Sequence, residues 1–128
     1  APKPVLFLVH GSSNAALSSY DLTVPGKSDY SMMNVYARLG YDVWTMDHEG
    51  YGKSSRTSGN SDIASGVEDL KAAAPVVARE TGRSKFHLYG TSSGGIFRPR
   101  SMRLTFSQSL KRLVFYSIIN FLFSQLSE

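Results

Sequence analysis

The sequence of 128 residues contains no cysteine. This absence excludes a disulfide scaffold, a thiolate nucleophile and any zinc or iron–sulfur site with cysteine ligands. Long apolar runs are also lacking: residues 113–123 form the longest, which is about half of the ~20 residues that cross a bilayer. The apolar run at residues 5–9 is too short for the core of a signal peptide. We therefore expect neither a signal peptide nor a transmembrane segment, and the compartment stays open.

Glycine and acidic residues are nearly absent from the last quarter of the chain. All 11 glycines lie at or before Gly95, and Glu128 is the only acid after residue 97. Residues 1–97 carry nine basic and nine acidic side chains, whereas residues 98–128 carry five basic ones and one acid, so the net charge of +4 lies in the tail. We expect a core at 1–97 and a basic, apolar tail at 98–128 that could form a helix and one strand. The basic residues of this tail lack the interleaved aromatics of a nucleic-acid interface, so no nucleic-acid partner is expected.

Apolar runs and helical patterns alternate through the first 97 residues. Short apolar runs at residues 5–9, 41–46 and 86–89 predict buried strands. Apolar residues at helical spacing predict a helix over residues 29–39, and a second one that ends before Gly82. The order strand, helix, strand, helix, strand is typical of an α/β fold, with a mostly parallel sheet of about four strands and helices on both faces.

Three local features refine these predicted elements. Residues 12–28 form a polar loop that is too long for a simple connection. Ser61 or Asn60 is the expected N-cap of the second helix. Pro75 is expected to kink that helix or to end its regular part.

Residues 90–94, Gly-Thr-Ser-Ser-Gly, fit the pattern G-x-S-x-G directly after the third apolar run. In this context the pattern predicts a turn so sharp that Ser92 takes a strained backbone conformation. Glycine is needed on both sides, because side chains there would collide with the neighbouring strand and helix. A tight turn without chemistry is the alternative interpretation.

Two further motifs follow the other apolar runs: His-Gly-Ser-Ser at residues 10–13 and Asp-His-Glu-Gly-Tyr-Gly-Lys-Ser at residues 47–54. Together the three motifs resemble the N-terminal half of an α/β-hydrolase. That family has His-Gly after its third strand, D-x-R-G-x-G-x-S after its fourth and G-x-S-x-G after its fifth. The resemblance covers residues 4 to about 97, with one departure: Glu49 stands where the family usually has arginine.

The resemblance implies a serine hydrolase that acts on a carboxylic ester or related acyl bond of a small molecule, with no metal and no cofactor. Ser92 would be the nucleophile, and the backbone N–H groups of Ser93 and Ser12 would form the oxyanion hole. Six further residues would support this site structurally: His10, Gly11, Gly90, Gly94, Asp47 and His48. A role for His10 or His48 as an improvised base stays open, and His87 is expected to be a core histidine.

The residues that should activate Ser92 are missing from this sequence. In the family order an Asp or Glu and then a His follow the serine, but after Ser92 there is no histidine, no aspartate and only Glu128. We therefore expect a truncated and inactive hydrolase, or alternatively a non-catalytic α/β-hydrolase-like fragment or binding module. A change of reading frame near residue 97 is a further hypothesis. The oligomeric state stays open.

Overall fold

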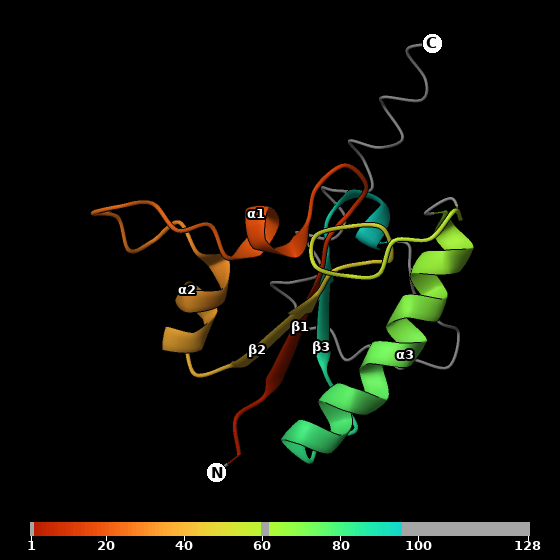
Figure 1. Ribbon diagram of the computed structural model, residues 1–128. Helices are drawn as coiled ribbons and strands as arrows, with labels where there is room; N and C mark the ends of the chain where they lie inside the picture. Colours follow the sequence, from red (N-terminus) through yellow and green to blue (C-terminus); the bar gives the residue numbers. More distant parts are fainter. Residues whose placement is uncertain (1, 60–61, 96–128) are drawn as a thin grey trace, which may run out of the picture.

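The computed structural model describes residues 2–59 and 62–95 (Figure 1). Within these ranges the chain forms three strands, three α-helices and a final 3-10 turn. In chain order they are β1 (Val5–Val9), α1 (Ala16–Tyr20), α2 (Met32–Arg38), β2 (Asp42–Met46), α3 (Ile63–Thr81), β3 (His87–Gly90) and η1 (Ser92–Gly95). The tail expected at 98–128, with its helix and strand, lies outside the described residues. No helix in the described ranges has the length and apolar character needed to cross a bilayer.

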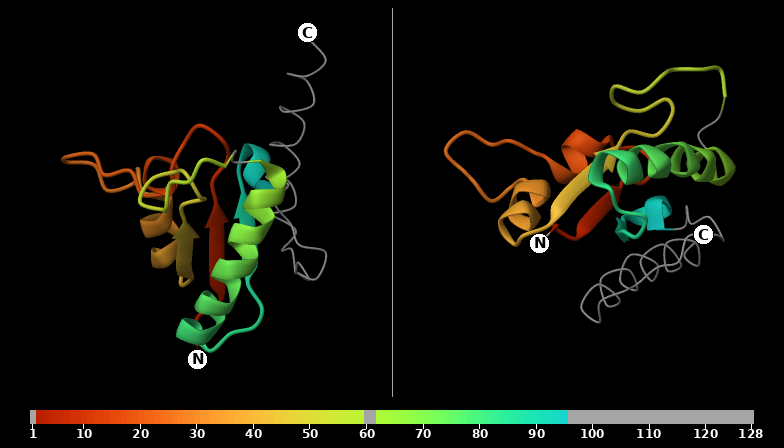
Figure 2. Two further views of the ribbon diagram at one scale, coloured as in Figure 1. Left: turned by 45° about the vertical axis from the view of Figure 1, so that its right-hand side comes forward. Right: turned by 90° about the horizontal axis from the view of Figure 1, so that it is seen from below.

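The three strands form one parallel sheet in the order β2-β1-β3. The chain therefore runs from the central strand to one edge and then crosses back to the other edge. Right-handed crossovers in opposite directions place their helices on opposite faces of the sheet. The two further views show α2 on one face of the sheet and α3 on the other (Figure 2). The predicted α/β class is confirmed.

β1 is the centre of the core, and all five of its residues are buried. Its odd-numbered residues pack with Leu70 and Val77 of α3. Its even-numbered residues, Leu6 and Leu8, pack with Tyr20 and with side chains of α2. Burial of each such side chain contributes about 1.5–3 kcal/mol, and a strand covered on both faces needs a continuous apolar run.

α2 begins at Met32, three residues later than the pattern predicts. The hydroxyl of Ser31 caps it by accepting a hydrogen bond of 3.0 Å from the N–H of Asn34. Ser31 also closes the base of a projecting arm, residues 21–31, because it forms a bridge with Asp21 and its hydroxyl donates to that carboxylate. This arm therefore delays the start of the helix. At the other end Gly40 has φ 94°, as expected of a residue just past a helix.

α3 is capped by Asp62, so the expectation of Ser61 or Asn60 was wrong by one or two residues. The Asp62 carboxylate accepts a hydrogen bond of 2.8 Å from the N–H of Ser65. Nor does Pro75 end the helix, which continues to Thr81. Pro75 is exposed, so water can satisfy the carbonyl that loses its partner.

The segment expected as a loop at 12–28 contains the short helix α1. Its first N–H, that of Ala16, donates to the Asp47 carboxylate, which comes from the loop after β2. Ala16 and Tyr20 are both buried. A helix of five residues stabilised in this way leaves no pattern in the sequence, because its capping group lies 31 residues away.

Candidate active site

The three motifs lie together at the carboxyl edge of the sheet. β1 and β3 are parallel neighbours, so the loop after Val9 and the turn after Gly90 start side by side. The strand order reverses between these two strands, because β1 continues to β2 while β3 returns from the other side. In open α/β sheets, ligands bind at such a reversal, outside the carboxyl ends of the strands.

The turn after β3 has the strained geometry expected from its sequence. Ser92 has φ 53°, in the left-handed region that residues with a side chain rarely adopt. Such a residue costs about 1–3 kcal/mol, which the surrounding contacts must offset. A Cβ on Gly94 would lie 2.5 Å from the carbonyl oxygens of Val9 and His10, and a Cβ on Gly90 would overlap the backbone of Gly94. Ser92 is exposed at the tip of this turn.

Gly11 brings the loop after β1 against the same serine. A Cβ at Gly11 would lie 2.7 Å from the Ser92 Cβ, 3.3 Å from its Oγ and 2.7 Å from the Thr91 carbonyl oxygen. Only glycine permits this approach. The first and third motifs are therefore in direct contact at Ser92.

The two residues predicted as oxyanion donors contact each other. The N–H of Ser12 donates a hydrogen bond of 2.9 Å to the Ser93 Oγ, and the two hydroxyl oxygens are 3.0 Å apart. The next residue, Ser13, has φ 73° and its N–H donates to the Tyr51 hydroxyl. Backbone N–H groups of this loop thus point toward the elbow and toward Tyr51.

His10 joins the loops after β1 and β2. It is fully buried, its Nδ1 lies 2.8 Å from the Gly11 carbonyl oxygen, and its Nε2 accepts a hydrogen bond of 3.0 Å from the N–H of His48. These partners assign the proton to Nδ1. Its ring also meets the rings of His48 and Tyr51 edge-on, with centroids 4.7 Å and 5.2 Å away. Because both nitrogens are engaged, this arrangement favours a bracing role over that of a base.

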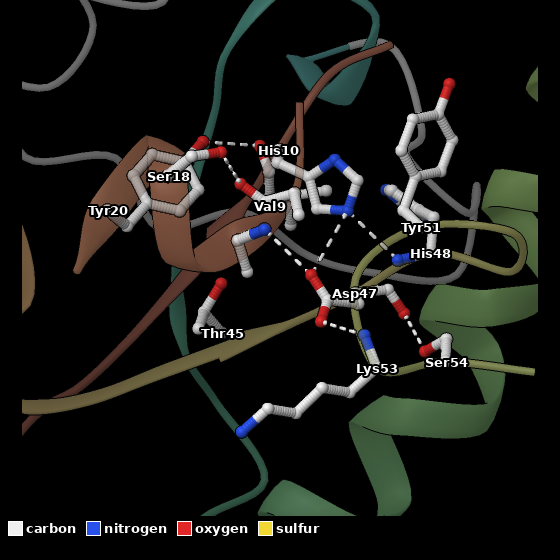
Figure 3. Close-up of polar contacts among 12 residues, drawn as sticks. Val9, His10, Ser18, Tyr20, Thr45, Asp47, His48, Tyr51, Lys53 and Ser54 are labelled. Carbon is white, nitrogen blue, oxygen red and sulfur yellow. Dashed lines mark hydrogen bonds and ion pairs between the residues drawn. The ribbon is translucent and has the colours of Figure 1, made fainter. Parts of the chain in front are cut away.

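The Asp47 carboxylate holds two backbone segments together (Figure 3). One oxygen accepts from the N–H of Ala16 at 2.8 Å, and the other accepts from the N–H of Lys53 at 2.9 Å. The Asp47 carbonyl oxygen accepts from the Ser54 hydroxyl at 2.6 Å. Partial burial raises the pKa of Asp47, but the hydrogen bonds from Lys53 and Ala16 outweigh it and the net pKa is lowered. A Cβ on Gly52 would overlap this carboxylate, so glycine is required there.

His48 is held by Asp69, a residue of α3 that the sequence did not single out. Nδ1 of His48 lies 3.0 Å from one Asp69 oxygen, which also accepts from the N–H of Glu49 at 3.0 Å. Burial lowers the pKa of His48, although the bond to Asp69 opposes that effect. The Glu49 carboxylate, at the position where arginine is usual, accepts from the Thr57 hydroxyl. The only signal for Asp69 in the sequence was that it is an acidic residue beside the apolar stripe of α3.

Tyr20 is a second residue that sequence reasoning missed. Its hydroxyl donates to the Val9 carbonyl oxygen at 2.6 Å and lies 2.9 Å from the Thr91 Oγ1. The N–H of Thr91 donates to the same Val9 oxygen, so Tyr20 ties the residue before Ser92 to the end of β1. Burial raises the pKa of Tyr20 to about 12. No motif indicates this residue, because α1 lies outside the three motifs.

His87 lies outside this site. It is the first residue of β3, at the opposite end of the strand from Ser92, and pairs in register with Leu6. It is half-buried, and the Tyr41 ring meets it edge-on at 5.9 Å.

The hollows near the carboxyl edge differ in size. A cavity of about 10 Å³ lies between the loops after β1 and β2 and the start of α3, which is room for about one water. A larger hollow of about 460 Å³ lies beside α1, lined among others by Leu17, Met33 and Lys53. Within the described ranges, no group of three or more histidine or acidic side chains could hold a metal ion.

The family model of Hydrolase_4, described as serine aminopeptidase S33, matches residues 26–117 of this sequence. The chain belongs to this family. It is a family of α/β-hydrolases, so the resemblance of the three motifs is confirmed at the level of family and fold. Residues 26–117 include the second and third motifs and extend past the described residues.

A crystal structure of a predicted CIB-like hydrolase from Thermoplasma acidophilum has the same fold. It is 23% identical, with a TM-score of 0.55 over 76% of this chain. The matched part is 43% of the archaeal chain, so the present chain spans less than half of that protein's length. A comparison with curated proteins gives no match.

Proposed function

We propose that this chain carries the nucleophile and the oxyanion loop of a serine hydrolase that cleaves a carboxylic ester or a related acyl bond. The observation that carries the proposal is the conformation of Ser92, φ 53° at the end of β3, with Gly11 packed against its Cβ. A serine held exposed on a strained turn, beside a loop with inward N–H groups, suits attack on a carbonyl carbon. The description of the family makes a peptide amide one such acyl bond.

The chemistry follows from these positions. The Ser92 Oγ forms a bond to the acyl carbon as its hydroxyl proton passes to solvent, and the carbonyl π electrons move to oxygen. The N–H groups of Ser12 and Ser93 donate to this oxyanion. As the oxyanion collapses, the bond to the leaving group breaks and the leaving atom takes a proton; water then releases the acyl group by the same steps.

Proton transfer is the step that this chain supports least. The three histidines of the sequence all precede Ser92. Both nitrogens of His10 are engaged, Nδ1 of His48 is bonded to Asp69, and His87 begins β3 at the far end. A positioned base contributes about 10²–10⁴-fold to such reactions. We therefore propose that Ser92 reacts slowly in these 128 residues.

A non-catalytic hydrolase-like binding module is the second candidate. It is favoured by the contact of the Ser12 N–H with the Ser93 hydroxyl, which engages a donor that catalysis would need.

Labelling with a fluorophosphonate probe tests both candidates. The wild-type chain is compared with Ser92→Ala, and with Ser18→Ala, which removes an exposed hydroxyl that donates to the Ala15 carbonyl oxygen. We expect slow labelling of wild type and Ser18→Ala, and none of Ser92→Ala. Fast labelling that Ser92→Ala abolishes contradicts the slow reaction, and equal labelling of all three contradicts Ser92 as nucleophile. No labelling at all favours the binding module.

A further inference from the structure

The Ser93 side chain makes a contact that the proposed reaction does not use. Its hydroxyl oxygen accepts the Ser12 N–H at 2.9 Å and lies 3.0 Å from the Ser12 Oγ, although the two residues are 81 positions apart. In the proposed oxyanion hole each of these serines contributes only its backbone N–H. The hydroxyl of Ser93, the residue after the proposed nucleophile, therefore already accepts the hydrogen bond of the Ser12 N–H.

An N–H group makes one strong hydrogen bond, along its own axis. An acceptor 2.9 Å from the Ser12 nitrogen fills the position that a substrate oxygen needs in order to use that donor. The Ser93 hydroxyl thus stands where a substrate oxygen would accept this hydrogen bond. The same bond holds the N–H of Ser12, in an exposed loop, toward the elbow.

The two possible occupants differ in charge. A neutral hydroxyl and a neutral substrate carbonyl are acceptors of similar strength, whereas an oxyanion forms a charge-assisted bond that is roughly twice as strong. The hydroxyl therefore competes with the ground-state carbonyl but yields to the oxyanion. Such a competitor weakens substrate binding more than transition-state binding.

The side chain is also able to leave. Ser12 is exposed and Ser93 is half-buried, so the released hydroxyl has access to water. A serine has three staggered χ1 positions and no bulky group to move. Rotation of Ser93 frees the donor without changing the backbone of η1.

We propose that Ser93 is a positioning residue: its hydroxyl occupies the position at the Ser12 N–H that an oxyanion would take, and it turns away when a negatively charged oxygen binds. This inference rests on the proposed function for the identity of the anion. Its ligand chemistry is that of a single anionic oxygen. If the Ser12–Ser93 hydrogen bond only held the two loops together, its removal in Ser93→Ala would instead weaken anion binding.

The test follows the backbone amide signal of Ser12 in the full ¹⁵N-labelled chain while sodium acetate is added, with sodium chloride at equal ionic strength as reference. Ser93→Ala removes the competing hydroxyl. Ser93→Thr retains it, and Ser18→Ala is the matched control for loss of one exposed hydroxyl. The spectra also report whether each variant is folded.

In the absence of acetate, we expect the Ser12 amide to exchange its hydrogen with solvent faster, and its signal to shift, in Ser93→Ala alone. With acetate, Ser93→Ala should bind about 2–10-fold more tightly than wild type, since one neutral hydrogen bond no longer competes. Ser93→Thr and Ser18→Ala should match wild type. An unchanged Ser12 signal in Ser93→Ala overturns the proposal, as does acetate binding that is equal to or weaker than that of wild type.

This experiment separates the inference from the proposed function. A tighter acetate site in Ser93→Ala without any labelling of Ser92 supports the positioning role and contradicts the hydrolase. Ser92-dependent labelling with unchanged acetate binding supports the hydrolase and contradicts the positioning role.

Discussion

Two regions at the carboxyl edge of the sheet differ in what holds their residues in place. The loop after β2, residues 47–54, contains the groups that look most catalytic, an aspartate beside a histidine. The loop after β1 and the elbow after β3 contain mainly serine and glycine. In the first region the side chains hold the backbone: Asp47 accepts two N–H groups and His48 is bonded to Asp69. In the second region the backbone holds the side chains, since close glycine contacts set where Ser92 lies.

This contrast separates residues with a chemically reactive side chain from residues that the fold exposes beside hydrogen-bond donors. Asp47 and His48 are titratable, but their polar atoms make hydrogen bonds that stabilise loops. Burial and these same hydrogen bonds shift their pKa values. Ser92 is chemically modest, but a strained turn exposes it beside N–H donors. Perturbed titratable groups at a sheet edge are therefore not sufficient evidence of an active site.

The largest effect is expected where the backbone holds the elbow. Gly94→Ala places a Cβ 2.5 Å from the carbonyl oxygens of Val9 and His10, which belong to the buried strand end and cannot withdraw. We expect a loss of about 3 kcal/mol in the free energy of unfolding, at the upper end of overpacking effects. Urea denaturation measures it.

Gly95→Ala is the matched control, because among the described residues its Cβ would meet only the Gly90 carbonyl group, with the oxygen at 3.5 Å and the carbon at 3.9 Å. We expect a change of less than about 1 kcal/mol there. Equal losses in the two variants would mean that close approach at Gly94 does not determine the elbow.

An intermediate effect is expected where a side chain holds the loop after β2. Asp47→Asn presents an NH₂ group to one of the two N–H donors, from Ala16 or Lys53, and leaves it without an acceptor. We expect a loss of about 2 kcal/mol at pH 7. Asp29→Asn, at a side chain that is 79% exposed, is the control and should change stability by less than about 0.5 kcal/mol.

The pH dependence of this variant has a definite sign. Because the folded pKa of Asp47 is lowered, its contribution to stability is complete above pH 3.8 and is lost as pH falls through the folded value. Urea denaturation at pH 7 and pH 3 should show a smaller difference between wild type and Asp47→Asn at the lower pH. A difference that grows on acidification would contradict the lowered pKa.

The smallest effect is expected for a link inside the second region, between the end of β1 and the elbow after β3. Tyr20→Phe removes the hydroxyl that joins Val9 and Thr91, while the N–H of Thr91 still donates to the Val9 oxygen. We expect a loss of about 1 kcal/mol at pH 8. Tyr30→Phe, at a residue that is 57% exposed, should leave stability unchanged.

Alkaline pH sharpens this prediction. The folded pKa of Tyr20 is raised to about 12 from 10.0, so wild type loses stability as pH rises through this window, whereas Tyr20→Phe has no such group to ionise. Guanidinium denaturation at pH 8 and pH 11 should therefore show the gap between the two proteins closing. A gap that stays constant would contradict the burial of a protonated hydroxyl.

Much of the fold could be predicted because its signals are local. The run at residues 5–9 became β1 without any shift, and Gly82 ended α3 with φ 67° in the left-handed region. The errors occurred where a distant group decides the boundary. α1 begins at the Asp47 carboxylate, and α2 starts late because Ser31 bonds Asp21 across the arm.

The candidate site divides in the same way. Ser92 and its glycines follow from one five-residue pattern, because backbone strain and steric contact act over a single turn. Tyr20 and Asp69 could not be found from the sequence, because each acts on a loop that is distant in the chain. Whether Ser92 reacts stays a prediction.

The sequence by itself determined three apolar strands, a sharp serine turn and a family, since these depend on neighbouring residues. The tertiary structure alone decided which polar groups meet: Ala16 with Asp47 across 31 positions, His10 with His48 across 38, and Ser12 with Ser93 across 81. Hydrogen bonds depend on distance and direction, and a parallel sheet brings its loops together irrespective of their separation along the chain. The absence of cysteine excluded one chemistry from the start, and folding decided how the remaining polar residues are used.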